Sequence, residues 1–123
     1  MHQHEAGRRG ERVALKYLRQ RGLRLITKNF RCRLGEVDLI MRDTSAIQSN
    51  ILVFVEVRYR ARLDYGGASA SVTPTKQRKL INTAEMFRKQ QSGYATWPCR
   101  FDVVAISGTL GNMQCCWLAG AFD

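Results

Sequence analysis

The sequence predicts a single α/β domain in which a helix is followed by three strands, a second helix and two more strands. Two observations support this class. Apolar residues recur at helical spacing in two stretches, and five other stretches alternate or are rich in β-branched residues. A chain of 123 residues corresponds to one domain. Its composition, 45% hydrophobic and 24% charged, is that of a globular protein and excludes disorder of the whole chain. We therefore treat residues 1–123 as one domain.

The first helix is predicted over residues 5–20. Ala14, Tyr17 and Leu18 recur there at helical spacing, and Gly22 stands where a left-handed C-terminal cap belongs. An extended stretch is expected next, over residues 23–33.

A turn or bulge is expected at Gly35, and the alternation of residues 36–42 predicts a second strand. One face of that strand is predicted to carry Val37, Leu39 and Met41. The opposite face is predicted to carry Glu36, Asp38 and Ile40.

A second helix is predicted to begin at Thr73, because threonine is a favoured N-cap and Pro74 suits the first helical position. It is expected to end near Gly93. Its apolar stripe comprises Leu80, Ile81, Ala84 and Phe87. Residues 100–106 and 113–118 then predict two further strands.

The charge of the chain indicates the class of its partners. Twenty Lys and Arg residues stand against ten Asp and Glu, and fifteen of the twenty are arginines, whose forked donors suit phosphate oxygens. Residues 1–33 alone hold ten cations and two acids. This asymmetry favours a polyanion, with nucleic acid as the leading partner. The alternative is a solvated surface that like charge keeps in solution.

The sequence predicts a cytoplasmic protein without a membrane partner. No apolar run approaches the ~20 residues that cross a bilayer, and the amino terminus lacks the apolar stretch of a signal peptide. The four cysteines form no C-x-x-C pair, so we expect free and buried thiols.

The most β-prone segment, residues 51–59, predicts a central strand and carries an unexpected pair of charges. Glu56 and Arg58 interrupt it on the face shared with Leu52 and Phe54. A buried charge is costly unless it meets a salt-bridge partner, a metal ion or a solvent-filled cleft.

If the strand that holds Asp38 is the neighbour of this central strand, Asp38 and Glu56 can converge on one point. Two carboxylates and the backbone carbonyl of Val57 would suit a hard cation such as Mg²⁺, which would polarise a phosphodiester. Glu11 lies along the apolar stripe of the first helix and can face the same sheet. The alternative is an ion pair of the acids with Arg58 that only neutralises the sheet face.

Three other polar or aromatic positions are interpreted as structural. Asp102 follows Arg100 in an otherwise apolar strand, and we expect a local ion pair or hydrogen bonds there. Trp97 and Trp117 are more typical of a core than of base stacking.

An ordered series of motifs runs along nearly the whole chain. It comprises Gly10-Glu11 and residues 29–40, 53–58, 72–80 and 100–104. The series resembles the YraN family of bacterial proteins. That family is similar to the restriction-endonuclease-like superfamily and, within it, to the archaeal Holliday-junction resolvases. The resemblance implies a restriction-endonuclease-like mixed β-sheet flanked by helices.

By this resemblance, Asp38 and Glu56 match the two metal-binding carboxylates, and Glu11 matches an acidic residue on the first helix. Arg58 occupies the position of the superfamily's active-site lysine. Because arginine stays charged whereas lysine can lose a proton, this departure weighs against cleavage more than against binding. Lys76 is either a substitute ammonium at the same site or a solvated residue.

The implied function is a Mg²⁺- or Mn²⁺-dependent endonuclease that acts on branched or irregular DNA, with a homodimer suited to a symmetric junction. The alternative is an inactive nucleic-acid-binding or interaction module on the same scaffold, which Arg58 favours. An RNA-associated protein would share the electrostatics. The arginines expected to hold the phosphate backbone are Arg8, Arg9, Arg12, Arg31, Arg33, Arg60 and Arg62. Such contacts predict an affinity that falls steeply with salt.

Overall fold

The computed structural model describes residues 2–45, 50–59, 72–109 and 111–122, with side chains from residue 8 onward. The elements follow the predicted order, α-β-β-β-α-β-β, with one short 3-10 helix added. They are α1 (His2–Arg19), β1 (Leu23–Cys32), β2 (Gly35–Asp43), β3 (Ile51–Tyr59), α3 (Pro74–Gln90), η1 (Ser92–Tyr94), β4 (Cys99–Thr109) and β5 (Asn112–Phe122). The α/β class is therefore confirmed.

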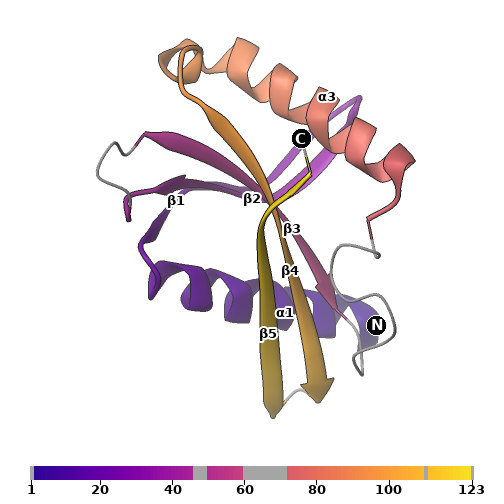
Figure 1. The fold of residues 1–123 in the computed structure, drawn as a ribbon. Coiled ribbons are helices and arrows are strands. Elements are labelled where there is room, and N and C mark those ends of the chain that lie inside the picture. Colours follow the sequence, from indigo (N-terminus) through magenta and orange to yellow (C-terminus); the bar gives the residue numbers. More distant parts are fainter. Residues whose placement is uncertain (1, 46–49, 60–71, 110, 123) are drawn as a thin grey trace.

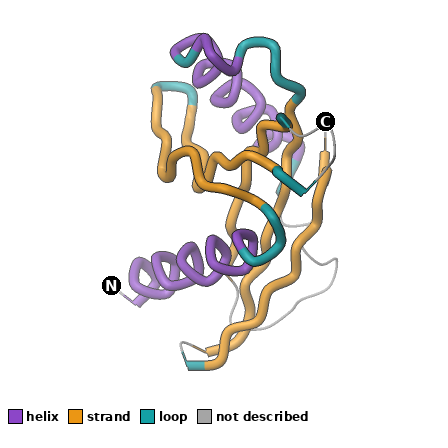
Figure 2. Tube along the Cα trace, turned by 90° about the vertical axis from the view of Figure 1, so that its left-hand side faces the viewer, coloured by secondary structure: helices purple, strands orange, loops and turns teal. Residues whose placement is uncertain are grey.

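The elements form three layers, with α1 and α3 on opposite faces of one sheet (Figure 1), and Figure 2 shows the same layers from the side. The strand order is β1-β2-β3-β4-β5, so β3 is central, as its composition predicted. It is antiparallel to β2 and parallel to β4, which makes the sheet mixed. A parallel pair needs a long crossover, and α3 lies within that connection.

Each helix covers a separate hydrophobic cluster. Ala14 and Leu18 of α1 are fully buried against Val53 and Val55 of β3 and their neighbours. On the other face, α3 buries Leu80, Thr83, Ala84 and Phe87. The predicted apolar stripe included Ile81, but Ile81 is only half-buried and Thr83 is buried instead. The Thr83 hydroxyl donates a hydrogen bond to the Lys79 carbonyl at 2.7 Å.

The helix ends follow from local sequence. The N–H of Gly22 donates to the Arg19 carbonyl at 3.3 Å, and Gly22 has φ +95°, a conformation that glycine adopts without strain. At the start of α3, the side chain of Thr73 accepts a hydrogen bond from the Lys76 N–H at 3.2 Å. Such an N-cap contributes about 1 kcal/mol.

The predicted alternation of β2 was wrong at Val37. Leu39 and Met41 pack on the α1 side, but Val37 packs with Ile40 on the α3 side. The reversal occurs where Asn29 stands opposite Asp38, since Lys28 pairs with Leu39 and Phe30 with Val37. Asn29 has φ +55°, the left-handed region that asparagine tolerates better than most residues.

This reversal turns the tip of the β1–β2 hairpin toward α3. There Phe30 meets Phe87 edge to face, with ring centroids 5.3 Å apart. The expectation of buried thiols was also wrong in part, since Cys99 and Cys116 are exposed, although all four cysteines are free. In the described part of the chain, no helix is both long and apolar enough to cross a membrane.

Candidate functional site

Asp38 lies at the point where β2 separates from β3. The register of the two strands runs from Asp43↔Ile51 to Leu39↔Val55 and goes no further. Asp38 is one residue beyond this register, and its Oδ2 accepts a hydrogen bond from the Val57 N–H at 2.8 Å. The carboxylate of Asp38 therefore takes the place of the β2 backbone carbonyl that would accept from the Val57 N–H if the strands stayed paired.

Glu56 lies beside this point on the face of β3 that α3 covers. Its side chain is only 6% exposed, yet neither of its two cationic neighbours makes a short contact with it. The Arg58 Nη1 is 3.4 Å and the Lys76 Nζ is 3.6 Å from the same oxygen, Oε2. Charge-assisted hydrogen bonds normally measure about 2.7–2.9 Å, so both contacts are loose.

Lys76 is therefore a neighbour of the predicted site and not simply a solvated residue on a helix. It reaches Glu56 from the first turn of α3, whereas Arg58 reaches the same oxygen from β3. The site thus holds both a guanidinium and an ammonium beside one buried carboxylate.

Electrostatics couple the two acids. Burial, followed by repulsion from the charge of Glu56, raises the pKa of Asp38 to about 8, although the Val57 N–H acts in the opposite direction. Near neutral pH, Asp38 therefore retains a proton much of the time. A cation placed between the two carboxylates would relieve their repulsion.

Glu11 approaches the site from α1. Burial raises its pKa most, a hydrogen bond with the Asn29 side chain lowers it, and repulsion from Glu36 and Glu56 raises it further. The charge of Glu56 is thus only a minor influence on Glu11. The structure brings Glu56 into contact with Arg58 and Lys76 and sets Asp38 against the Val57 N–H beside them, whereas Glu11 lines a pocket with Arg8 and Arg12 on the α1 side.

The donor set fits a hard divalent cation. In a strand, the N–H and C=O of one residue point to the same side, so the Val57 carbonyl faces the gap into which its N–H donates. Mg²⁺ is commonly held by one or two carboxylates and keeps several waters, a demand that these oxygens can meet. Within the described ranges, no three His, Cys, Asp or Glu side chains are grouped so that together they could hold a metal ion.

The structure places the predicted phosphate-binding arginines in separate regions of the molecule. Arg8 and Arg12 line a pocket together with Glu11. Arg31 lies near the hairpin tip, where its Nε is 3.0 Å from Glu36. Arg9 and Arg33 are exposed. Arg60 and Arg62 lie outside the described residues.

Two residues of this pocket, Lys28 and Asn29, were missed from the sequence. Lys28 resembles any exposed strand lysine, and its pairing with Leu39 places it on the α1 face. Asn29 carried the only available signal, because asparagine within a strand pattern favours a left-handed residue.

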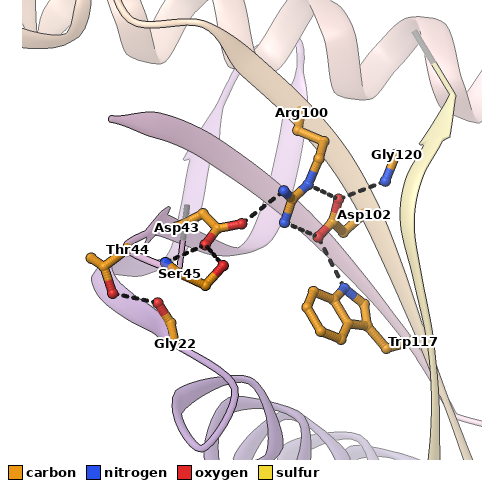
Figure 3. A network of polar contacts seen from close by, with 8 residues as sticks. All are labelled: Gly22, Asp43, Thr44, Ser45, Arg100, Asp102, Trp117 and Gly120. Carbon is orange, nitrogen blue, oxygen red and sulfur yellow. Dashed lines mark hydrogen bonds and ion pairs between the residues drawn. The ribbon is translucent and has the colours of Figure 1, made fainter. Parts of the chain in front are cut away.

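A second acidic cluster, shown in Figure 3, is structural. Arg100 donates through Nε and Nη2 to Asp102 at 2.9 and 3.0 Å, and through Nη1 to Asp43 at 2.8 Å. The predicted ion pair of Asp102 is confirmed. The indole of Trp117 donates to it as well, at 3.0 Å, which accounts for the half-buried position of this tryptophan.

The fold and site define an α/β protein whose mixed sheet carries the buried Glu56 and the half-buried Asp38 at a strand divergence, bordered by basic side chains. The model of the uncharacterised protein family UPF0102 matches residues 10–106. The chain belongs to this family, which is the YraN family that its motifs resemble.

Relatives align with nearly the whole chain. A UPF0102 protein of Pseudomonas syringae pv. tomato is 46% identical, over 97% of this chain and 93% of the relative. One of Nitrosococcus oceani is 45% identical, over 96% and 91%. A UPF0102 protein of Herminiimonas arsenicoxydans is 49% identical, over 95% and 86%.

Proposed function

We propose that this protein is a divalent-metal-dependent endonuclease that hydrolyses phosphodiester bonds in DNA, with branched or irregular DNA as its substrate. One observation carries the proposal: where β2 leaves β3, the Asp38 carboxylate accepts from the Val57 N–H, and the buried Glu56 carboxylate beside it has only loose contacts with Arg58 and Lys76. Burial and the charge of Glu56 raise the pKa of Asp38 to about 8. Buried acids with strongly shifted pKa values are typical of functional sites.

Asp38, Glu56 and the Val57 carbonyl are the groups that would hold Mg²⁺ or Mn²⁺. Such an ion, when bound, polarises a phosphodiester and lowers the pKa of water. Arg58 keeps its charge at all relevant pH values and stabilises phosphate oxygens. Lys76 donates hydrogen bonds that orient the attacking water. Glu11, on α1, adds an acid from the neighbouring pocket that Arg8 and Arg12 also line.

The position of Lys76 bears on the alternative function. An inactive binding module is favoured by Arg58, because arginine cannot take part in proton transfer. Lys76, 3.6 Å from Glu56, offers an ammonium from α3 in place of the one missing from β3. This contact is why we favour the nuclease over the inactive module.

The test is cleavage of a labelled four-way junction, a flap, single-stranded DNA and RNA in Mg²⁺ or Mn²⁺. Wild type should cleave at least one DNA substrate, and Asp38→Asn and Glu56→Gln should each lose at least a hundredfold in rate. Arg78→Gln, an exposed change on α3, is the matched control and should cleave normally. Tight binding by wild type with no cleavage of any substrate would establish the inactive module instead. Cleavage of RNA alone would replace the DNA substrate.

Lys76→Ala and Arg58→Lys separate the two cationic neighbours. If Lys76 substitutes for the missing lysine, Lys76→Ala should abolish cleavage in the wild-type background. Arg58→Lys should restore part of it in the Lys76→Ala background. No effect of Lys76→Ala on the rate would contradict the proposed role.

A homodimer is part of the proposal, and β5 is the strand that would support it. Asn112–Phe122 form an edge of the described sheet without a charged residue or proline, and Leu118 is 37% exposed. The other edge, β1, carries Arg24 and Lys28 and a shift of register, features that discourage pairing. Light scattering after size exclusion should report a dimer that Leu118→Lys dissociates. A nucleic-acid substrate is also consistent with a cytoplasmic protein.

A further inference from the structure

Two adjoining pockets form a continuous groove between α1 and β1. The smaller measures about 140 Å³ and the larger about 510 Å³, and they share Arg12, Leu15 and Lys28. The smaller pocket contains Glu11 and Asn29, whereas the larger extends to Arg19 at the end of α1. We refer to this feature, lined by both sets of residues, as the α1–β1 groove.

The groove is cationic on both of its walls. The helix contributes four cations at intervals of three or four residues, and β1 contributes one. These are Arg8, Arg12, Lys16, Arg19 and Lys28, all exposed. Four residues of helix rise about 6 Å, which is comparable to the separation of neighbouring phosphates along a nucleic-acid strand.

The groove cations, like several other exposed arginines and lysines, lack salt-bridge partners in the described part of the chain, but these five are gathered along one groove. Among the residues that the structure describes, Arg31, Arg58, Lys76 and Arg100 each lie within salt-bridge distance of a carboxylate. No such contact is present for the five groove cations in the same part of the chain. Glu11, which interacts with Lys28, offsets part of their mutual repulsion, and solvent, salt or an anionic ligand relieves the rest.

The position and size of the groove indicate which anion it would hold. Among the described residues that line it, Glu11 is the only acid, and it lies in the smaller pocket with Asn29, which stands opposite Asp38 across the β1–β2 pair. The larger pocket falls within the ~300–1,000 Å³ range of small-ligand sites, which suits a nucleotide or two but does not enclose a duplex. Leu15 lies at the junction of the two pockets, where it can contact sugar or base.

We propose that the α1–β1 groove binds one single strand of nucleic acid and leads its backbone from Arg19 toward the carboxylate pair. The direction of the path, toward the reaction site, rests on the proposed nuclease function. Binding of the strand in the groove does not depend on that function. The groove would receive the unpaired or displaced strand of an irregular DNA.

The test measures binding without metal, so that cleavage does not enter. A fluorescein-labelled twenty-nucleotide single strand is titrated in EDTA at several salt concentrations, with fluorescence anisotropy as the readout. The groove variant combines Arg12→Gln, Arg19→Gln and Lys28→Gln. The control variant removes the same charge from exposed positions elsewhere, by Arg24→Gln, Arg78→Gln and Lys89→Gln.

The groove variant should bind at least tenfold more weakly than wild type at physiological salt, and the control variant within threefold. The slope of log K against log salt should flatten by about 2 in the groove variant, because each lost phosphate contact on a single strand removes about 0.7. Equal losses in both variants, or none in the groove variant, would overturn the proposal. So would tighter binding of the matched blunt duplex, or equal binding of an inorganic polyphosphate of the same charge.

The result of this binding test can be distinguished from the result of the cleavage test of the proposed nuclease. Asp38→Asn should bind the strand at least as tightly as wild type, because Asp38 already holds a proton much of the time near neutral pH, where its pKa is about 8, and the amide adds no negative charge. If wild type cleaves nothing but the groove variant loses binding, the groove stands and the nuclease fails. If wild type cleaves and both variants bind and cleave alike, the nuclease stands and the groove fails. Thermal melting of each variant verifies folding.

Discussion

The sheet holds two clusters of acids and arginine that differ in how well their charges are satisfied. Asp102 is fully buried and accepts four hydrogen bonds, two from Arg100, one from Trp117 and one from the Gly120 N–H at 2.9 Å. Glu56 is almost as buried, but its two cationic neighbours remain 3.4 and 3.6 Å away. Similar residue types thus form a closed network in one place and an open one in the other.

The pKa values of the two clusters move in opposite directions. Burial alone would raise the pKa of Asp43, but hydrogen bonds from Ser45 and Arg100 outweigh it and leave the pKa below its ordinary value. The pKa of Asp38 rises to about 8, because burial and Glu56 exceed the single hydrogen bond from Val57. A closed network stabilises the fold, whereas an open one retains capacity for a ligand.

The largest expected effect is the loss of a partner in the closed network. Asp102→Ala leaves Nε and Nη2 of Arg100 and the Trp117 indole without their acceptor, while Nη1 of Arg100 keeps Asp43. Breaking a buried pair in this way typically costs about 3–5 kcal/mol, and we expect a loss of that order in the free energy of unfolding. Urea denaturation measures it. Glu56→Gln is the control from the open network and should cost far less, so equal losses would contradict the distinction between the clusters.

The next effect is the pH dependence of stability in the open network. Because the folded pKa of Asp38 exceeds the unfolded value of about 3.9, the unfolded chain releases this proton first as pH rises. Stability should therefore fall between about pH 4 and pH 8, by at most about 1.4 kcal/mol per pH unit. Urea midpoints at pH 5 to 8 test this slope.

Asp38→Asn should flatten that slope and stabilise the protein at pH 7, by on the order of 2 kcal/mol. The amide oxygen can still accept from the Val57 N–H, and the repulsion from Glu56 is removed. A destabilised Asp38→Asn protein would instead indicate a structural ion pair. The lowered pKa of Asp43 acts only in acid, where its contribution disappears as pH falls below about 4.

Metal binding should produce a smaller but diagnostic stabilisation. At Mn²⁺ concentrations ten times the Kd, wild type should gain about 1.4 kcal/mol, because the ion binds only the folded state. Asp38→Asn and Glu56→Gln should lose this gain and the heat of binding in calorimetric titration. Thermal melts with and without Mn²⁺ give the comparison, and an equal gain in all three proteins would place the ion elsewhere.

The smallest expected effect concerns the reversal of faces at Asn29. Asn29→Ala should cost about 1 kcal/mol, because alanine is strained at φ +55°. Asn29→Gly should be tolerated by the backbone. Both variants lose the hydrogen bond to Glu11, so the pKa of Glu11 should rise in both, as NMR titration of the carboxyl group can measure. Equal stability of the two variants would show that the left-handed residue is not required.

Much of the fold could be predicted because its signals are local. The β-branched run predicted residues 51–59 with the observed bounds of β3, and Thr73-Pro74 marked the start of α3. Asp38 and Glu56 could be nominated because a charge in a buried-looking strand is costly wherever the strand lies. The ion pair of Asp102 with Arg100 was also visible, since the two residues stand two apart on one strand face.

Tertiary structure decided the rest, because the relevant contacts join distant segments. The face of Val37 depends on the left-handed Asn29 across the hairpin, which strict alternation does not anticipate. The contact of Lys76 with Glu56 depends on the crossing of α3 over β3. Periodicity and capping signals predicted where the elements lie, and charges in apolar strands indicated the candidate site residues. Only packing between elements determined which carboxylates were satisfied, and that balance separates the structural acids from those proposed to act.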